Sequence, residues 1–116
     1  MAEDTVMRTM LFDFYGELLT DKQREYYDLH YNEDLSLYEI AEQSGVSRQA
    51  VWDIIRRAEA AMVETEKKTG FVAKAVRRRR ELEEIREQLR RLEEMTQGEA
   101  QSLAHSLGER LGALED

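Results

Sequence analysis

The chain has 116 residues, of which 41% are hydrophobic and 36% charged, and it contains neither cysteine nor proline. The lack of cysteine excludes a disulfide framework, a cysteine-ligated zinc site and thiol catalysis. The abundance of Glu, Arg, Leu and Ala predicts an all-α protein of domain size. Because no apolar run is long enough to span a membrane, and residues 1–8 are acidic rather than a cationic leader, we expect a soluble protein that stays in the cytoplasm.

The net charge of −8 is distributed unevenly along the chain. Residues 1–46 carry a net charge of −8, residues 47–95 a net charge of +3, and residues 96–116 a net charge of −3. A dedicated DNA-binding domain is usually basic as a whole. We therefore expect at most a basic stripe on an acidic body.

Two helices are predicted in the first 31 residues. The first should run from about Thr5 to Leu19, with one apolar stripe at helical spacing formed by Met7, Met10, Leu11, Phe14 and Leu18. The pattern Thr20-x-x-Gln23 is a capping box that opens a second helix to about Tyr31, with Tyr26, Tyr27 and Leu29 facing inward.

A short helix, a tight turn and a longer helix should follow. Ser36-x-x-Glu39 is a second capping box, which opens a helix through Gln43 with Leu37, Ile40 and Ala41 buried. Gly45 supplies the positive φ that the next turn needs. Ser47 caps a helix that ends near Gly70, with an inward stripe formed by Val51, Ile54, Ile55, Ala58 and Met62.

Beyond Gly70 the apolar spacing becomes that of a heptad repeat. The seam consists of Phe71, Ala75, Arg78, Leu82, Ile85, Leu89 and Leu92. Thr96-x-x-Glu99 resembles a third capping box before a last amphipathic segment with Leu103, Leu107, Leu111 and Leu114. We expect a helix-turn-helix bundle over residues 1–70 and a helical tail over residues 71–116. Either the last segment or a second copy could cover the seam, and we predict a homodimer through the tail.

Residues 36–58 form the most informative stretch. A short capped helix, Gly45-Val46 and a second helix beginning at Ser47 match the layout of a helix-turn-helix, whose second helix enters the major groove. Arg48 can donate two hydrogen bonds to guanine, Gln49 can pair with adenine, and Ser47 at a helix N-terminus suits a phosphate. A helical hairpin with ordinary caps would show the same pattern, so the residues alone leave both interpretations open.

These residues also resemble a known family. The segments Leu19-Thr20-x-x-Gln23, Leu35-Ser36-x-x-Glu39-Ile40-Ala41 and Gly45-Val46-Ser47-x-x-Ala50-Val51 are similar to region four of bacterial sigma factors. The similarity to the small YlxM proteins is closer, through Leu11-Phe12-Asp13-Phe14-Tyr15-Gly16 and Val46-Ser47-Arg48-Gln49-Ala50-Val51. It is dense from Met10 to Arg57, and beyond Arg57 the chain is similar only as a helical tail.

The resemblance implies an all-helical, sigma-like bundle that binds DNA as a regulator or takes part in the signal recognition particle pathway. Its implied nucleic-acid contacts are Ser47, Arg48 and Gln49, followed by Arg56 and Arg57. Trp52 and Asp53 depart from the basic and small polar residues that sigma factors place there, and Ile54 stands where they often carry Arg. Trp52 could stack on a base, anchor a protein partner or fold back onto the bundle.

Other candidate sites are weaker. His30 and His105 are far apart in sequence and show no metal spacing, Ser47 has no neighbouring base, and no glycine-rich phosphate loop exists. We therefore expect neither an enzyme nor a cofactor. The run Arg77–Arg80 could bind a nucleic-acid backbone, but pairing with the glutamates beside it is the interpretation that we favour.

Two functional hypotheses remain at this point. In the first, the recognition helix binds DNA as a regulator, which its spacing favours. In the second, the module docks on the signal recognition particle GTPase or its RNA without specific DNA binding, which the acidic balance favours.

Overall fold

The computed structural model describes residues 2–115, and side chains from Thr5 onward. Within this range the chain forms six α-helices and one short 3-10 helix, and no strand. The prediction of an all-α fold is confirmed. The chain divides into two compact units, residues 1–72 and residues 73–116, which are described separately.

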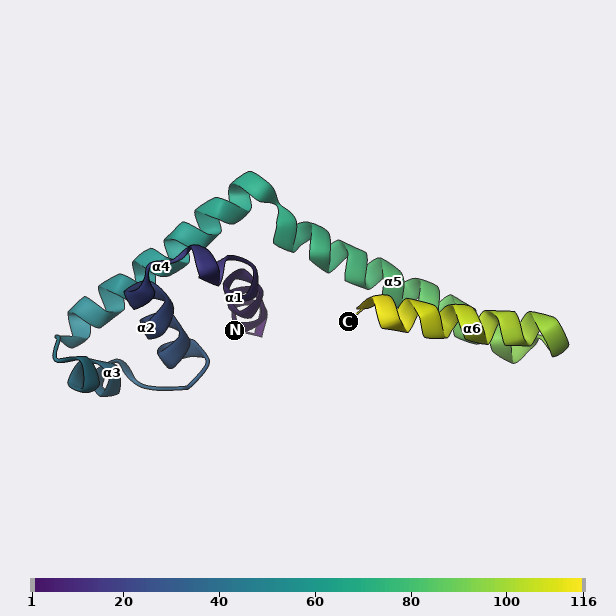
Figure 1. Ribbon diagram of the computed structural model, residues 1–116, viewed down its shortest axis with the longest axis horizontal. Coiled ribbons are helices and arrows are strands. Elements are labelled where there is room, and N and C mark those ends of the chain that lie inside the picture. The colour runs from purple at the N-terminus through teal and green to yellow at the C-terminus, as the bar shows by residue number, and fades with distance from the viewer. Residues whose placement is uncertain (1, 116) are drawn as a thin grey trace. The chain divides into compact units, whose positions relative to one another are not determined.

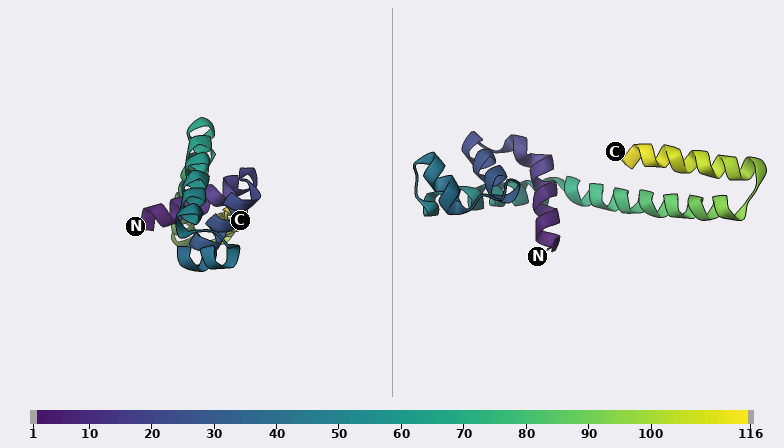
Figure 2. Two further views of the ribbon diagram at one scale, coloured as in Figure 1. Left: turned by 90° about the vertical axis from the view of Figure 1, so that its left-hand side faces the viewer. Right: turned by 90° about the horizontal axis from the view of Figure 1, so that it is seen from below.

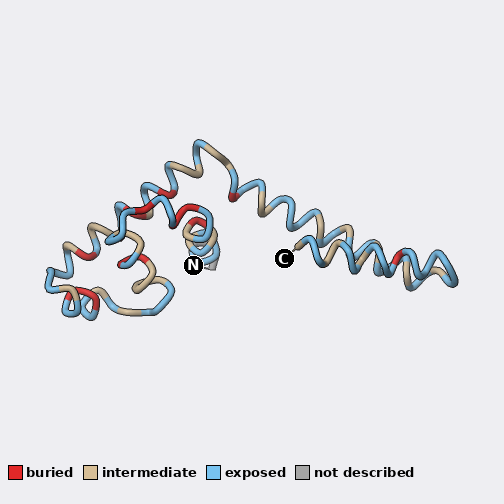
Figure 3. Tube along the Cα trace, in the orientation of Figure 1, coloured by how far each residue is buried: buried red, intermediate tan, exposed pale blue. Residues whose placement is uncertain are grey.

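The first unit is a helical bundle built on one long helix (Figure 1). Helix α4 (Arg48–Thr69) is packed by α1 (Ala2–Tyr15), α2 (Asp21–Tyr31) and α3 (Leu37–Ser44), and η1 (Gly16–Leu18) follows α1 directly. The buried residues line the inner sides of these helices (Figure 3). The largest fully buried side chains in this unit are Tyr26, Tyr27, Ile40, Val51, Ile55, Met62 and Val72.

The predicted helix caps of this unit are confirmed. Thr20 and Ser36 each form a complete capping box, in which the hydroxyl accepts from the third backbone N–H and the third side chain accepts from the cap N–H. Ser47 Oγ accepts from the N–H of Ala50 at 3.0 Å. Gly45 and Gly70 end α3 and α4 with φ of 70° and 67°, a conformation that residues with a Cβ rarely adopt.

The predicted apolar stripe of the first helix is right for Leu11, which is buried, and Met10, which is half-buried, and wrong for its other three members. Met7, Phe14 and Leu18 are 45%, 44% and 72% exposed, whereas Leu11 and Tyr15 are buried. The helix also ends at Tyr15, four residues before Leu19, because the backbone tightens into η1. The face of α1 that packs against the bundle is therefore rotated about the helix axis relative to the face that apolar spacing predicts.

Polar contacts to α4 accompany the buried Leu11 and Tyr15 on the inward side of α1. Arg8 Nε donates to Glu59 Oε1 at 2.7 Å, and the Tyr27 hydroxyl donates to the same oxygen at 3.0 Å. Burial and the Glu59 carboxylate raise the pKa of Tyr27, and the hydrogen bond to Glu59 raises the pKa of Arg8. The Arg8 and Glu59 side chains are each 32% exposed, so this cluster lies at the edge of the core and joins one side of α1 to α2 and α4.

Glu66 lies where α1 meets the end of α4. The Tyr15 hydroxyl donates to Glu66 Oε1 at 2.6 Å, and the backbone N–H of Val72 donates to the same oxygen at 3.0 Å. The N–H of Phe71 donates to Thr69 Oγ1 at 3.3 Å. Side chains of α4 thus satisfy N–H groups at the start of the next helix, which would otherwise lack partners.

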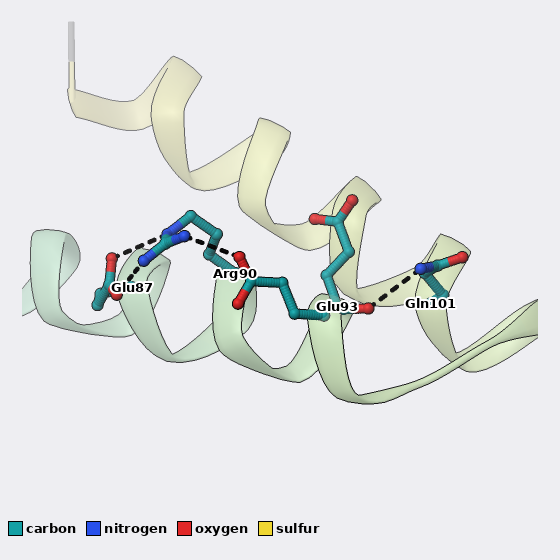
Figure 4. A network of polar contacts seen from close by, with 5 residues as sticks. Glu87, Arg90, Glu93 and Gln101 are labelled. Atoms are coloured by element: carbon teal, nitrogen blue, oxygen red, sulfur yellow. Dashed lines mark hydrogen bonds and ion pairs between the residues drawn. The ribbon is translucent and has the colours of Figure 1, made fainter.

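The second unit is an antiparallel helical hairpin formed by α5 (Phe71–Met95), from Ala73 onward, and α6 (Gly98–Glu115) (Figure 2). Gln101 Nε2 donates to the carbonyl of Glu93 at 3.2 Å, as Figure 4 shows. Arg86 pairs with Glu115 at 2.8 Å. Ala104 is buried, and a Cβ on Gly112 would lie 3.4 Å from the Arg86 guanidinium. Small residues of α6 therefore approach α5 closely.

One prediction for this unit is wrong, and one is confirmed in part. Thr96 does not cap α6, because its Oγ1 donates backward to the carbonyl of Leu92 at 2.7 Å and α6 begins at Gly98 with φ of 67°. The fold-back of α6 onto α5, one of the two coverings that the sequence allows, is present. It leaves much of the apolar surface uncovered, since only Leu111 of the four α6 leucines is half-buried. The exposed side chains are Leu92 at 46%, Met95 at 78%, Leu103 at 62%, Leu107 at 36% and Leu114 at 71%.

None of the helices, over the described residues, is both long and apolar enough to cross a membrane.

Candidate nucleic-acid interface

The candidate interface is built by α3, the turn at Gly45-Val46 and α4. The N–H groups of Gly45 and Val46 both donate to the carbonyl of Ala41, at 2.9 and 3.2 Å, which closes the end of α3 and reverses the chain. Ile40 and Val51 are fully buried between the two helices. Because one side of α4 is held against the bundle, its first turn projects its other side chains outward.

The first turn of α4 presents the three residues that the sequence singled out. Ser47 Oγ already accepts from the N–H of Ala50, so its hydroxyl hydrogen is what remains for an anion. Arg48 and Gln49 are exposed, and neither has a polar partner among the described residues. The guanidinium and the side-chain amide are therefore both available to an external ligand.

Trp52 lies one turn further along α4 and is 41% exposed. Its ring meets the edge of the His30 ring at a centroid distance of 6.5 Å, and Nδ1 of His30 lies 2.8 Å from the carbonyl oxygen of Leu35. The indole thus contacts the bundle on one side and is open on the other. The expectation that Trp52 folds back onto the bundle therefore holds for one side of the indole only.

Arg56 and Arg57 differ from Arg48 because both form ion pairs with one carboxylate. Asp53 Oδ1 lies 2.9 Å from Arg56 Nη2, and Asp53 Oδ2 lies 3.2 Å from Arg57 Nη2. The three side chains are at helical i,i+3 and i,i+4 spacing, which brings them together on the surface. A single acid therefore offsets much of the positive charge that sequence reasoning assigned to this helix.

Sequence reasoning missed two exposed apolar residues beside this site. Tyr38 at the start of α3 is 57% exposed and Val46 in the turn is 41% exposed. The capping box at Ser36 could have indicated the first of these, because it orients the helix so that Ile40 and Ala41 face inward. Glu39 in the same box has a pKa lowered by its hydrogen bond from the Ser36 backbone, so it adds a firm negative charge nearby.

Neither histidine forms a metal site in the described part of the chain, where no group of three His, Asp or Glu side chains could hold an ion. His105 does have two carboxylate partners that the sequence analysis overlooked, Glu93 at 2.9 Å and Glu109 at 3.3 Å. One comes from the opposite helix of the hairpin and the other from the next turn of α6.

Comparison with known proteins identifies the family. Residues 2–102 match the model of UPF0122, described as "Putative helix-turn-helix protein, YlxM / p13 like". The chain belongs to the UPF0122 family. The resemblance to YlxM proteins is confirmed.

UPF0122 proteins from several bacteria are similar over most of their length. The protein of Symbiobacterium thermophilum is 53% identical over 89 residues, which cover 77% of this chain and 83% of the relative. The protein of Geobacillus kaustophilus is 50% identical over 91 residues, covering 78% and 83%. That of Halalkalibacterium halodurans is 48% identical over 87 residues, covering 75% and 80%.

Proposed function

We propose that this UPF0122 protein is a regulatory protein that binds double-stranded DNA through α3 and α4. The observation that carries the proposal is the pair of exposed, unpartnered side chains Arg48 and Gln49, which begin α4 directly after the Gly45 turn. Arg donates two parallel hydrogen bonds to the major-groove edge of guanine, and Gln matches that of adenine. The helix start therefore carries two side chains that can distinguish bases.

Phosphate contacts would come from the flanking residues. The Ser47 hydroxyl and the free N–H groups at the α4 N-terminus suit one phosphate oxygen. Arg56 and Arg57 lie two to three turns further and can contact the backbone once Asp53 releases them. Trp52 provides an apolar surface for a thymine methyl group. Because the module is acidic overall, we expect weak non-specific binding and a strong dependence on the right sequence.

We further propose that residues 71–116 form a separate dimerisation segment, and that residues 1–70 form the DNA-binding part. In the hairpin, a polar groove is lined by side chains such as Glu83, Arg90, His105 and Glu109, and no leucine lines it. The exposed leucines of α6 therefore lie away from this groove. A second hairpin packed on them would bury an apolar surface that α6 leaves open, and a two-fold dimer is the commonest closed arrangement. Such a dimer would present two recognition helices to a palindromic site, in the cytoplasm of a bacterial cell.

Selection of bound sequences from a random duplex library tests the DNA-binding proposal. The full chain should enrich a short motif, and the double variant Arg48→Ala/Gln49→Ala should abolish the enrichment. Arg110→Ala, which removes an exposed arginine far along the chain, is the control and should enrich the same motif. If the full chain enriches no motif at any salt concentration, the proposal is wrong.

A second candidate function is protein or RNA docking without specific DNA binding. Tyr38, Val46 and Trp52 expose apolar surface on the same module, and Asp53 offsets the charge of Arg56 and Arg57. Exposed aromatic side chains of this kind anchor many protein interfaces. The GTPase and RNA of the signal recognition particle are the partners to test. Retention of either by the full chain, lost in Trp52→Ala and without any enriched DNA motif, would favour this function.

A further inference from the structure

The run Arg77–Arg80 is the densest unpaired charge in the second unit. All four arginines are exposed, and none forms an ion pair or polar contact with any described residue. Residues 74–80 contain five basic and no acidic side chains. The sequence-based interpretation of a solvated, self-paired helix is therefore right about the solvation and wrong about the pairing with neighbouring glutamates.

The order of charges along α5 gives these arginines acidic neighbours on one side only. Glutamates stand four residues after three of them, at positions 81, 83 and 84, so i,i+4 pairs could form. That order, with the base on the N-terminal side, is the weaker one on a helix. The same order does form a pair further along α5, where Arg90 pairs with Glu94 after it at 2.9 Å, but Arg90 also has Glu87 before it at 2.5 Å (Figure 4). No acid stands in the turn before Arg77–Arg80.

The second helix of the hairpin does not reach the arginines. The α6 residue Glu115 pairs with Arg86, and α6 ends there. Arg80 lies six residues nearer the N-terminus of α5, which is about 9 Å along the axis at 1.5 Å per residue. The hairpin therefore leaves this turn of α5 as a single helix.

We propose that Arg77–Arg80 form a second nucleic-acid contact, an arginine collar that binds the phosphate backbone of duplex DNA. Successive residues on a helix point about 100° apart, so four consecutive arginines surround the axis. A helix that is charged on all sides fits a groove that has a phosphate row on each wall. The major groove of B-DNA is about 12 Å wide and admits an α-helix.

Other anionic surfaces match the collar less well. An anionic lipid surface attracts arginines, but it contacts a helix from one side only and leaves those on the far side without a phosphate. The major groove of A-form RNA is too narrow and deep for side chains to read. Arg favours phosphate because its planar guanidinium donates two parallel hydrogen bonds. The collar is independent of the helix-turn-helix, and either contact can fail while the other holds.

Fluorescence anisotropy of the full chain with a labelled random-sequence DNA duplex, titrated with salt, tests the collar. The variant Arg78→Gln/Arg79→Gln should bind at least five-fold more weakly at low salt. The slope of log affinity against log salt should flatten by roughly 0.9 for each lost phosphate contact. The matched control Arg91→Gln/Arg110→Gln removes the same charge from two exposed arginines of the same unit and should change affinity less than two-fold.

Further arms of the experiment separate the possible ligands. Replacing all four arginines by Lys should keep most of the salt slope, and circular dichroism should show unchanged helix content. Equal losses in the two matched variants, or no binding of the duplex by the full chain, would overturn the proposal. So would tighter binding to anionic lipid vesicles or to duplex RNA than to duplex DNA. Arg48→Ala leaves the collar intact, so it should remove the selected motif and keep the affinity for the random-sequence duplex. Failure of the full chain to select any motif would count against the helix-turn-helix and not against the collar.

Discussion

Asp53 holds Arg56 at 2.9 Å on the outer face of α4, and its second oxygen holds Arg57 at 3.2 Å. All three side chains are at least partly exposed, so the pairs add little to the stability of the fold. Their consequence is electrostatic. Two arginines that would otherwise attract phosphate are partly neutralised next to the proposed recognition residues.

We therefore predict that Asp53→Asn strengthens binding to random-sequence DNA. Releasing both arginines and removing one negative charge should raise the affinity about three- to ten-fold at low salt and steepen the salt dependence. Anisotropy titrations over a range of salt concentrations measure both quantities. Glu64→Gln removes an exposed acid from the same helix and is the control. Equal gains in both variants would mean that only net charge matters.

Substitutions in α4 should weaken DNA binding in two different ways. Arg48→Ala and Gln49→Ala should each weaken binding to the selected site by roughly 1–3 kcal/mol, because each removes a base contact. Arg56→Ala should weaken binding to all sequences evenly and flatten the salt slope. Competition titrations with selected and random duplexes distinguish the two effects. Unchanged binding in all three variants would refute the assignment of α4 as the recognition helix.

The exposed leucines of α6 should hold the proposed dimer together. Leu103→Asp places a charge where a second hairpin would pack, and should convert a dimer to a monomer at micromolar concentration in sedimentation experiments. Ser102→Asp adds the same charge at the adjacent exposed position and should leave the dimer intact. Helix content should stay unchanged in both. A full chain that is monomeric at high concentration would show that the leucine surface has no partner copy.

The capping box at Ser36 should make folding sensitive to acid. The hydrogen bond from the Ser36 backbone N–H to Glu39 lowers the pKa of that carboxylate below its unfolded value. Its contribution is therefore complete above the unfolded pKa near 4.5 and is lost as the pH falls through the folded pKa. Glu39→Gln keeps an acceptor but does not titrate. Thermal melts between pH 7 and pH 3 should show a smaller loss of stability for Glu39→Gln than for the unsubstituted protein. Identical losses would contradict the role of Glu39 in this acid sensitivity.

Contacts over a few residues could be predicted from the sequence. The caps at Thr20, Ser36 and Ser47 and the turn at Gly45 each depend on groups within five residues, so local chemistry decides them. The helix-turn-helix layout follows from these signals, and with it the exposed position of Arg48 and Gln49. The pairing of Asp53 with Arg56 and Arg57 is equally local, and their spacing could have indicated it.

Tertiary structure alone decided which surfaces are buried. Arg8 and Glu59 are 51 residues apart, and they meet on the side of α1 that buries Leu11 and Tyr15, so that Met7 and Phe14 face outward although their spacing suggests a core. The hairpin is similar, because Gly112 and Ala104 let α6 approach α5 and leave Leu103 exposed. Apolar periodicity shows that a helix has an apolar side, but the burial of that side depends on the shape and charge of whatever packs against it. The amino-acid sequence thus determined the helices and their ends, and the packing between distant segments determined which of their faces remain free to bind.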